Sequence, residues 1–382
     1  MWIRHRSGFL PQASVAASGG FRTLCVVRRG FRCLVALLLL AAAGRAADYP
    51  APTEGDFTIS NFHFQSGEVL PALRMHYRTL GTPRRDATGV VRNAVLVLHG
   101  TGGSGRQFLT DRFAGVLFCA GGLLDANRYF IILPDDIGTG QSSKPSDGLH
   151  ARFPRYNYHD MLVAEHQLLT EGLHVDHLRL VMGTSMGGMH TWMWGEMYPD
   201  FMDALMPLAS LPIQISGRNR MMRDMIMDSI RNDPEWRGGE YQTQPRGVVC
   251  ATYILLILVS SPLQWYKEAP TQQAADEKLR QMVDTITART DANDVLYQVD
   301  ASRDYNPEPD LEKIQGPLLA INSADDQVNP PELRIVEKEI KRVKRSRFVL
   351  LPTTDQTRGH GTHSLPEIWK QCLAELLAQS EK

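Results

Sequence analysis

The stretch GTSMGGM, residues 183–189, follows the apolar run LRLVM at 178–182 and precedes the helix-like stretch MHTWMWGEMYP at 189–199. It fits the pattern G-x-S-x-G at a sharp turn from a strand to a helix. Such a turn strains the backbone of the central serine, and the flanking glycines have no side chains to collide as the turn closes. The pattern therefore predicts that Ser185 projects from the carboxyl end of a strand as a nucleophile. A glycine-rich turn with an incidental serine is the alternative.

Apolar runs that end in small or polar residues recur along the chain and indicate strands that are buried on both faces. They are NAVLVLHG (93–100), RYFIILPDD (128–136), LRLVMG (178–183) and GPLLAINS (316–323). Helical periodicity separates them, most clearly in YHDMLVAEHQLLTEGL at 158–173. Upstream, two short runs within 57–81 flank QSGEVLP and predict an antiparallel pair. This alternation predicts an α/β fold, a mainly parallel sheet flanked by helices.

The alternation breaks between about residues 210 and 300, where segments rich in Met, Arg and Gln predict an inserted helical cap. We therefore expect a first part of the core over 48–209, the cap over 210–300 and a second part of the core over 301–382. Within the cap, TYILLILVSS at 252–261 is too short to cross a bilayer, which takes ~20 residues. We expect it to form a buried cap helix.

The first 46 residues have a different composition from the rest of the chain. Several arginines precede the apolar run CLVALLLLAAAG (33–44), and the small residues of GRAAD (44–48) suit cleavage. This pattern predicts a signal peptide over residues 1–46 and a secreted or periplasmic protein. A retained membrane anchor is the alternative, but the run is shorter than the ~20 residues of a spanning helix. We expect no stable membrane span after signal removal.

The remaining composition limits the partners and the redox chemistry. Lys and Arg number 41 against 42 Asp and Glu, so the formal net charge of −1 provides no field to hold nucleic acid. We expect a small-molecule substrate and predict neither a cofactor nor a metal site; a homodimer is compatible with the sequence but not determined by it. Cys119, Cys250 and Cys372 remain in the mature chain without the spacing of a disulfide framework. Three free thiols are favoured, while one pair stays open.

A serine nucleophile needs a base that is oriented by an acid. AINSADDQVNPPEL at 320–333 places Asp325 and Asp326 just beyond a predicted strand, and RGHGTHS at 358–364 places His360 and His363 after the strand RFVLLP. The order Ser, Asp, His along the chain is the order of one known class of triad. The pattern therefore predicts a triad, with two choices of acid and two of base.

A second hydrogen-bond donor for an oxyanion is available in HGTGG at 99–103, after the strand NAVLVL. We expect the backbone amides of Thr101 and Met186 to form the oxyanion hole. GTGGSG at 100–105 also fits the dinucleotide fingerprint G-x-G-x-x-G. That alternative leaves GTSMGGM and GHGTH unexplained, and Asp135 and Asp136 follow about ten residues too late for the ~20 residues expected after that fingerprint.

Together these stretches resemble the homoserine O-acetyltransferase group of the α/β-hydrolase superfamily. The resemblance runs from Phe57 to Trp369 and rests on SGEVLPALRMHYRTLGT, NAVLVLHGTGG, HDMLVAEHQLLTEGL, LVMGTSMGGMHTWMWGEMYPD, DDQVNPP and GHGTH. It implies an α/β-hydrolase fold whose helical cap roofs the pocket and confines access to a tunnel. In that family the acid precedes a loop that ends in a proline pair, which selects Asp326 over Asp325. The base follows a glycine, which selects His360 over His363.

The departures from the family bear on the substrate. By the resemblance, an arginine in the cap holds the homoserine carboxylate and an aspartate after the catalytic histidine holds the ammonium; the corresponding positions here are Thr252 and Gly361. We therefore expect Ser185 to form an acyl-enzyme that water resolves, in the hydrolysis of a small ester. The alternatives are O-acyl transfer from a thioester to an alcohol, and a non-catalytic binding protein on the same fold.

Overall fold

The computed structural model describes residues 49–381. The predicted signal peptide, residues 1–46, lies outside the described residues. The chain forms an eight-stranded sheet in the order β1-β2-β4-β3-β5-β6-β7-β8. The strands are β1 (Thr53–His63), β2 (Val69–Leu80), β3 (Ala94–Leu98), β4 (Phe130–Pro134), β5 (Leu180–Thr184), β6 (Leu205–Leu208), β7 (Leu318–Ser323) and β8 (Ser346–Leu351).

The sheet is antiparallel at one edge and parallel elsewhere. β1 pairs with β2 and β2 pairs with β4 in antiparallel register, and every pairing from β4 to β8 is parallel. The α/β fold class with a mainly parallel sheet is confirmed. The five strands β3 to β7 are buried along their whole length, which explains why they read as unbroken apolar runs rather than as alternating ones.

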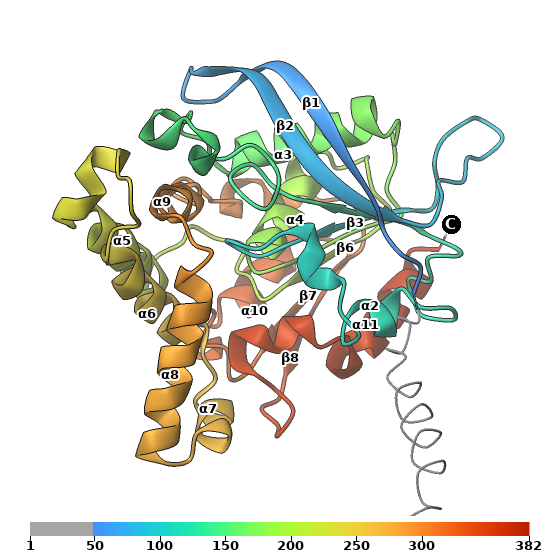
Figure 1. The fold of residues 1–382 in the computed structure, drawn as a ribbon. Helices are drawn as coiled ribbons and strands as arrows, with labels where there is room; N and C mark the ends of the chain where they lie inside the picture. The colour runs from blue at the N-terminus through green and yellow to red at the C-terminus, as the bar shows by residue number, and fades with distance from the viewer. Residues whose placement is uncertain (1–48, 382) are drawn as a thin grey trace, which may run out of the picture. The chain divides into compact units, whose positions relative to one another are not determined.

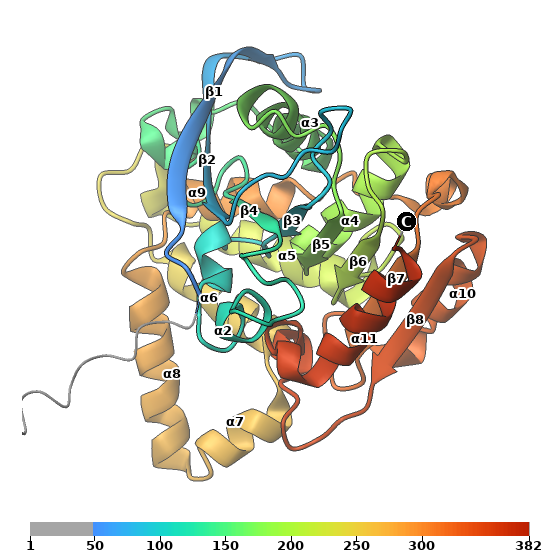
Figure 2. The ribbon, with the colours of Figure 1, turned by 90° about the vertical axis from the view of Figure 1, so that its right-hand side faces the viewer.

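Helices cover both faces of this sheet (Figures 1 and 2). The core helices are α2 (Ala114–Leu117), α3 (Tyr158–Gln167), α4 (Met186–Met197), α10 (Ile335–Glu339) and α11 (Pro366–Gln379). Successive strand residues face opposite sides, so Val95 and Val97 pack with α2 and α11, whereas Leu96 and Leu98 pack with α3, α4 and α10. The helix α3 starts at a capping box between Asn157 and Asp160.

The segment between β6 and β7 carries five helices and a small core of its own. The helices are α5 (Gly217–Arg231), α6 (Gly247–Val259), α7 (Pro262–Glu268), α8 (Gln272–Thr287) and α9 (Ala292–Asp300), which group at the left of Figure 1. Buried apolar residues of α5, α6 and α9, such as Ile230, Val248 and Leu296, form a cluster separate from the two sheet cores. This segment occupies the range predicted for the inserted cap.

The expectation of a buried helix over 252–261 holds only in part. The helix α6 buries Leu256 and Leu258, but Ile257 is 56% exposed and Tyr253 is 43% exposed. A continuous apolar run does not reveal which of its side chains find a neighbour, and in α6 buried and exposed apolar side chains alternate. In the described residues no single helix is long and apolar enough to span a membrane, although α6 and α7 reach that length and composition as a pair bent by 108°.

The thiols of Cys119, Cys250 and Cys372 are free.

Candidate active site

The turn at Ser185 has the strained backbone that the sequence predicts. Ser185 lies between β5 and α4 with φ 56° and ψ −112°, a positive φ that residues with a side chain rarely adopt. A Cβ atom on Gly183 would lie 2.0 Å from the carbonyl oxygen of Gly187, and one on Gly187 would lie 2.1 Å from the carbonyl oxygen of Leu98. Only glycine fits at both positions, so the sequence fixes how closely α4 approaches β5 and β3.

A chain of hydrogen bonds joins Ser185 to His360 and Asp326. His360 Nε2 lies 2.8 Å from Ser185 Oγ, and His360 Nδ1 lies 2.9 Å from Asp326 Oδ2. Asp326 follows β7 and His360 lies in the turn after β8, so parallel strands bring both loops to the sheet edge where β5 ends. With Nδ1–H donating to the carboxylate, Nε2 is left to accept the serine proton.

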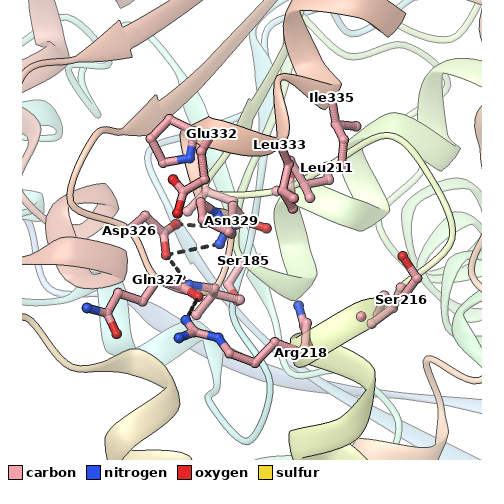
Figure 3. A pocket seen from close by; sticks show the side chains of 18 of the residues that line it. Ser185, Leu211, Ser216, Arg218, Asp326, Gln327, Asn329, Glu332, Leu333 and Ile335 are labelled. Atoms are coloured by element: carbon pink, nitrogen blue, oxygen red, sulfur yellow. Dashed lines mark hydrogen bonds between the residues drawn. The ribbon is translucent and has the colours of Figure 1, made fainter.

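Asp326 is held as an ion. Its side chain is almost fully buried, and it accepts hydrogen bonds from the Val328 amide at 2.8 Å and the Asn329 side chain at 3.0 Å. Burial alone would raise its pKa, but the nearby His360 ring and these donors outweigh burial and lower the pKa below its ordinary value. Figure 3 shows the contact between Asp326 and Asn329 beside Ser185.

The two neighbouring candidates make other contacts. Asp325 accepts from the Thr357 hydroxyl at 3.0 Å and from the Gly359 amide at 2.8 Å, and so ties down the turn that carries His360. The His363 ring bonds to the Ser364 hydroxyl. Sequence order could not separate Asp325 from Asp326 or His363 from His360, whereas the structure brings only Asp326 and His360 into hydrogen-bond contact with each other.

The loop after β3 lies against the serine. A Cβ atom on Gly100 would lie 3.4 Å from Ser185 Cβ, and the carbonyl oxygen of His99 accepts from the Gly187 amide at 2.9 Å. Within residues 49–381 the backbone amides of Thr101 and Met186 donate no hydrogen bond. Two unused amides, one in the loop after β3 and one at the start of α4, are compatible with the predicted oxyanion hole, which remains a prediction.

Ser185 opens into a cavity of about 760 Å³. The loop after β7 forms one wall, and the segment before and within α5 forms another (Figure 3). The exposed Arg218 of α5 donates to the backbone carbonyl of Gln327, next to Asp326, and so links the helical segment to the loop of the acid. The cavity volume suits a small organic substrate.

Sequence reasoning missed Arg223, a buried residue that lines this cavity. A signal existed, because Arg223 occupies the same helical face as Ile226, Met227 and Ile230, at steps of three, four and seven residues. A cation on the apolar face of an amphipathic helix indicates a buried charge.

The two positions that correspond to the homoserine-binding residues of the family do not line the cavity of Ser185. The Thr252 hydroxyl donates to the Val248 carbonyl within α6, and Gly361 lines a different cavity, beside Arg358.

Sequence reasoning also missed a buried polar cluster of Asp136, Glu165 and His190. These side chains are fully buried, and each offers a ligand atom within 4.8 Å of the others, so they could hold a metal ion. Glu165 bonds to the His190 ring at 3.2 Å and accepts from the Trp194 indole at 2.6 Å. Burial, followed by the neighbouring Glu165, raises the pKa of Asp136, and burial raises the pKa of Glu165 to about 7.

The raised pKa of Glu165 predicts a pH dependence of stability. The folded state keeps a proton that the unfolded state, with an ordinary pKa of 4.5, releases. The free energy of unfolding should therefore fall as the pH rises from 4.5 to about 7 and stay low above pH 7. Glu165→Gln removes the titrating carboxyl, and the glutamine side-chain oxygen can still accept from the Trp194 indole. The melting temperature of this variant should therefore fall less than that of the parent protein between about pH 5 and pH 8.

Thermal unfolding at several pH values tests this expectation. Glu277→Gln on the exposed surface of α8 is the matched control, because the same change there should leave the pH profile of the parent protein unaltered. Parallel profiles for Glu165→Gln and the parent would contradict the assigned pKa shift.

Comparisons with known proteins agree with this fold. Residues 93–354 match the family model described as alpha/beta hydrolase fold. A probable acyltransferase of Methanothermobacter thermautotrophicus is 31% identical over 278 residues, which cover 72% of this chain and 84% of that protein. A homoserine O-acetyltransferase of Moorella thermoacetica is 32% identical over 270 residues, which cover 62% of this chain and 70% of that protein.

A solved structure supports the fold independently. The acetylester hydrolase from Corynebacterium glutamicum matches with a TM-score of 0.72 and 19% identity, covering 86% of this chain and 96% of that chain. Relatives of this chain thus include proteins named as acyltransferases, and its fold is shared by a protein named as an ester hydrolase. The protein is therefore an enzyme of the α/β hydrolase fold family, with acyltransferases, homoserine O-acetyltransferases among them, as its relatives.

Proposed function

We propose that this enzyme hydrolyses a small ester through an acyl intermediate on Ser185. The observation that carries the proposal is the contact of Ser185 Oγ with His360 Nε2 at 2.8 Å, at the opening of a cavity large enough for a small substrate. A serine hydroxyl is a weak nucleophile, and a base at this distance can remove its proton during attack.

The reaction would proceed in two halves. In the first, Ser185 Oγ attacks the ester carbonyl as its proton passes to His360 Nε2, and Asp326 stabilises the resulting imidazolium. The Thr101 and Met186 amides would donate to the oxyanion, an arrangement in which one donor typically contributes ~2.7–4 kcal/mol. His360 then protonates the leaving alcohol. In the second half, His360 takes a proton from water as the water oxygen attacks the acyl carbon, and then returns that proton to Ser185 Oγ as the acid is released.

Two observations support water over homoserine as the acceptor. An amino acid brings a carboxylate and an ammonium, and burying either without a partner costs several kcal/mol. Thr252 bonds to its own helix and does not take the place of the family's arginine, and Gly361 has no side chain, so the ammonium in particular finds no partner. We also propose that the protein is exported, as its first 46 residues indicate; an exported enzyme would meet esters more readily than acetyl-coenzyme A.

Two assays on the purified protein test this proposal. One supplies acetyl-coenzyme A with homoserine and follows thiol release; the other supplies a panel of simple esters and follows acid release. We expect ester turnover that homoserine does not change. Efficient, saturable formation of O-acetylhomoserine would overturn hydrolysis in favour of acyl transfer. Labelling of Ser185 by a fluorophosphonate probe, absent in Ser185→Ala, would separate both reactions from a non-catalytic protein.

A further inference from the structure

Arg223 is a buried cation without a buried counter-ion. Its side chain is 6% exposed and lines the same cavity as Ser185. Its Nε donates to Asn219 Oδ1 and its Nη1 donates to Ser302 Oγ, each at 3.0 Å. Within residues 49–381 no carboxylate oxygen lies within 4.0 Å of its guanidinium nitrogens. A buried charge is costly unless it is paired, so an anionic group that entered the cavity would gain a partner in Arg223.

The other neighbours of Arg223 are hydroxyl groups. The Tyr158 hydroxyl lies beside Arg223, Thr101 and Ser302. Burial raises the pKa of Tyr158 although Arg223 opposes this, so the phenol keeps its proton and can donate. In the described part of the chain, the buried hydroxyls of Tyr158 and Thr101 lie close to each other, but neither oxygen makes a hydrogen bond of full geometry. Arg223 thus lies in a group of donors that lacks a strong acceptor, next to the loop that supplies the Thr101 amide.

The carboxylates that line the cavity are not available for a cationic ligand deep inside it. Asp326 accepts from His360 and Asn329, and Asp325 accepts from Thr357 and Gly359. The third, Glu332, is exposed to solvent. The interior therefore offers an unpaired guanidinium but no free carboxylate, a charge pattern that suits an anion without an ammonium group.

We propose that the ester substrate carries a free carboxylate and that Arg223 binds it while Ser185 attacks the ester carbonyl. This inference rests on the proposed ester hydrolysis. The planar guanidinium can donate two parallel hydrogen bonds to a carboxylate. The carboxylate can belong to the acyl part or to the alcohol part of the ester, because both present the same anion to Arg223.

Two pairs of matched substrates distinguish these sources. For the alcohol part, 4-acetoxybenzoate is compared with its methyl ester. For the acyl part, 4-nitrophenyl hydrogen adipate is compared with 4-nitrophenyl methyl adipate. The members of each pair differ only in the carboxylate charge and its methyl cap. We expect the parent enzyme to favour the anionic member of one pair by at least about tenfold in kcat/KM.

Arg223→Gln removes the charge and should lower that anionic-to-neutral ratio about 10- to 100-fold, as expected for a charge-assisted hydrogen bond. Arg223→Lys keeps the charge but loses the fork, so its ratio should lie in between. The matched control is Arg220→Gln on the same helix, where Arg220 pairs with Asp224 at 2.7 Å on the partly exposed side, and its ratio should equal that of the parent. The ratio is insensitive to a general loss of folded protein, which would lower both rates equally.

Calorimetric titration of Ser185→Ala with 4-acetoxybenzoate and 4-nitrophenyl hydrogen adipate measures binding without turnover. We expect one of them to bind, and Arg223→Gln in the same background to weaken it at least about tenfold. Ester turnover that depends on Ser185, with ratios near one in both pairs and no binding that depends on Arg223, would overturn this inference and leave the proposed function standing. Absence of any turnover that depends on Ser185 would overturn the proposed function, and the titration would still decide the role of Arg223.

Discussion

Ser185→Ala is expected to abolish turnover of a short activated ester, with a loss of about 10⁴- to 10⁶-fold in kcat, because attack requires the Ser185 oxygen itself. The variant keeps the Cβ atom, so the backbone of the turn between β5 and α4 should not change. Stopped assays with a chromogenic acetate ester measure the rate, and thermal unfolding measures whether the fold is intact.

The control for this variant is Ser216→Ala, which removes a hydroxyl from the same cavity without touching the hydrogen-bonded chain of His360. Its rate should stay within about threefold of the parent. Adding His360→Ala to Ser185→Ala should cost little more, since members of a triad act as a unit. Residual turnover through a covalent intermediate in Ser185→Ala would show that another residue is the nucleophile.

Asp326→Asn and His360→Ala are each expected to lower kcat by roughly 10⁴-fold. An amide at position 326 can donate to His360 Nδ1, which places the ring proton on Nε2 and removes the acceptor that faces Ser185 Oγ. His360→Ala removes that acceptor outright.

The neighbouring pair provides the matched controls. Asp325→Asn and His363→Ala change the same residue types one and three positions away and leave the hydrogen bonds of Asp326 and His360 in place, although His363→Ala removes an edge-to-face contact with the His360 ring. Their effects should be milder, although Asp325→Asn weakens the acceptor of the Gly359 amide. If these two variants prove more damaging than the first pair in protein that remains folded, the choice of Asp326 and His360 is wrong.

Local patterns in the sequence were enough to predict the fold and the position of Ser185. Apolar runs over 93–98 and 180–184 predict strands because β3 and β5 are buried on both faces, whatever their neighbours are. The turn at Ser185 is also local, since Gly183 and Gly187 lie within two residues of it and meet backbone atoms that a side chain would strike.

Other features depended on contacts that the sequence does not encode locally. The run in α6 predicted an apolar helix but not that Ile257 would be 56% exposed. Helical periodicity placed Arg223 on a buried face but could not show that this face reaches the cavity of Ser185. The pattern of a single element determines its type and its apolar side, while the contacts of that side depend on elements elsewhere in the chain.

The candidate site shows the same division. By itself, the sequence determined an α/β fold and a serine at a strained turn, because strand burial and turn sterics act over a few residues. It left two aspartates and two histidines open without the family resemblance. Only the tertiary structure brought His360 to Ser185, across 175 positions of the chain, and turned Asp326 rather than Asp325 toward its ring. Neighbouring residues in a loop have nearly the same sequence context but point in different directions, and only the packing of β7 and β8 against the rest of the sheet decides which direction meets the serine.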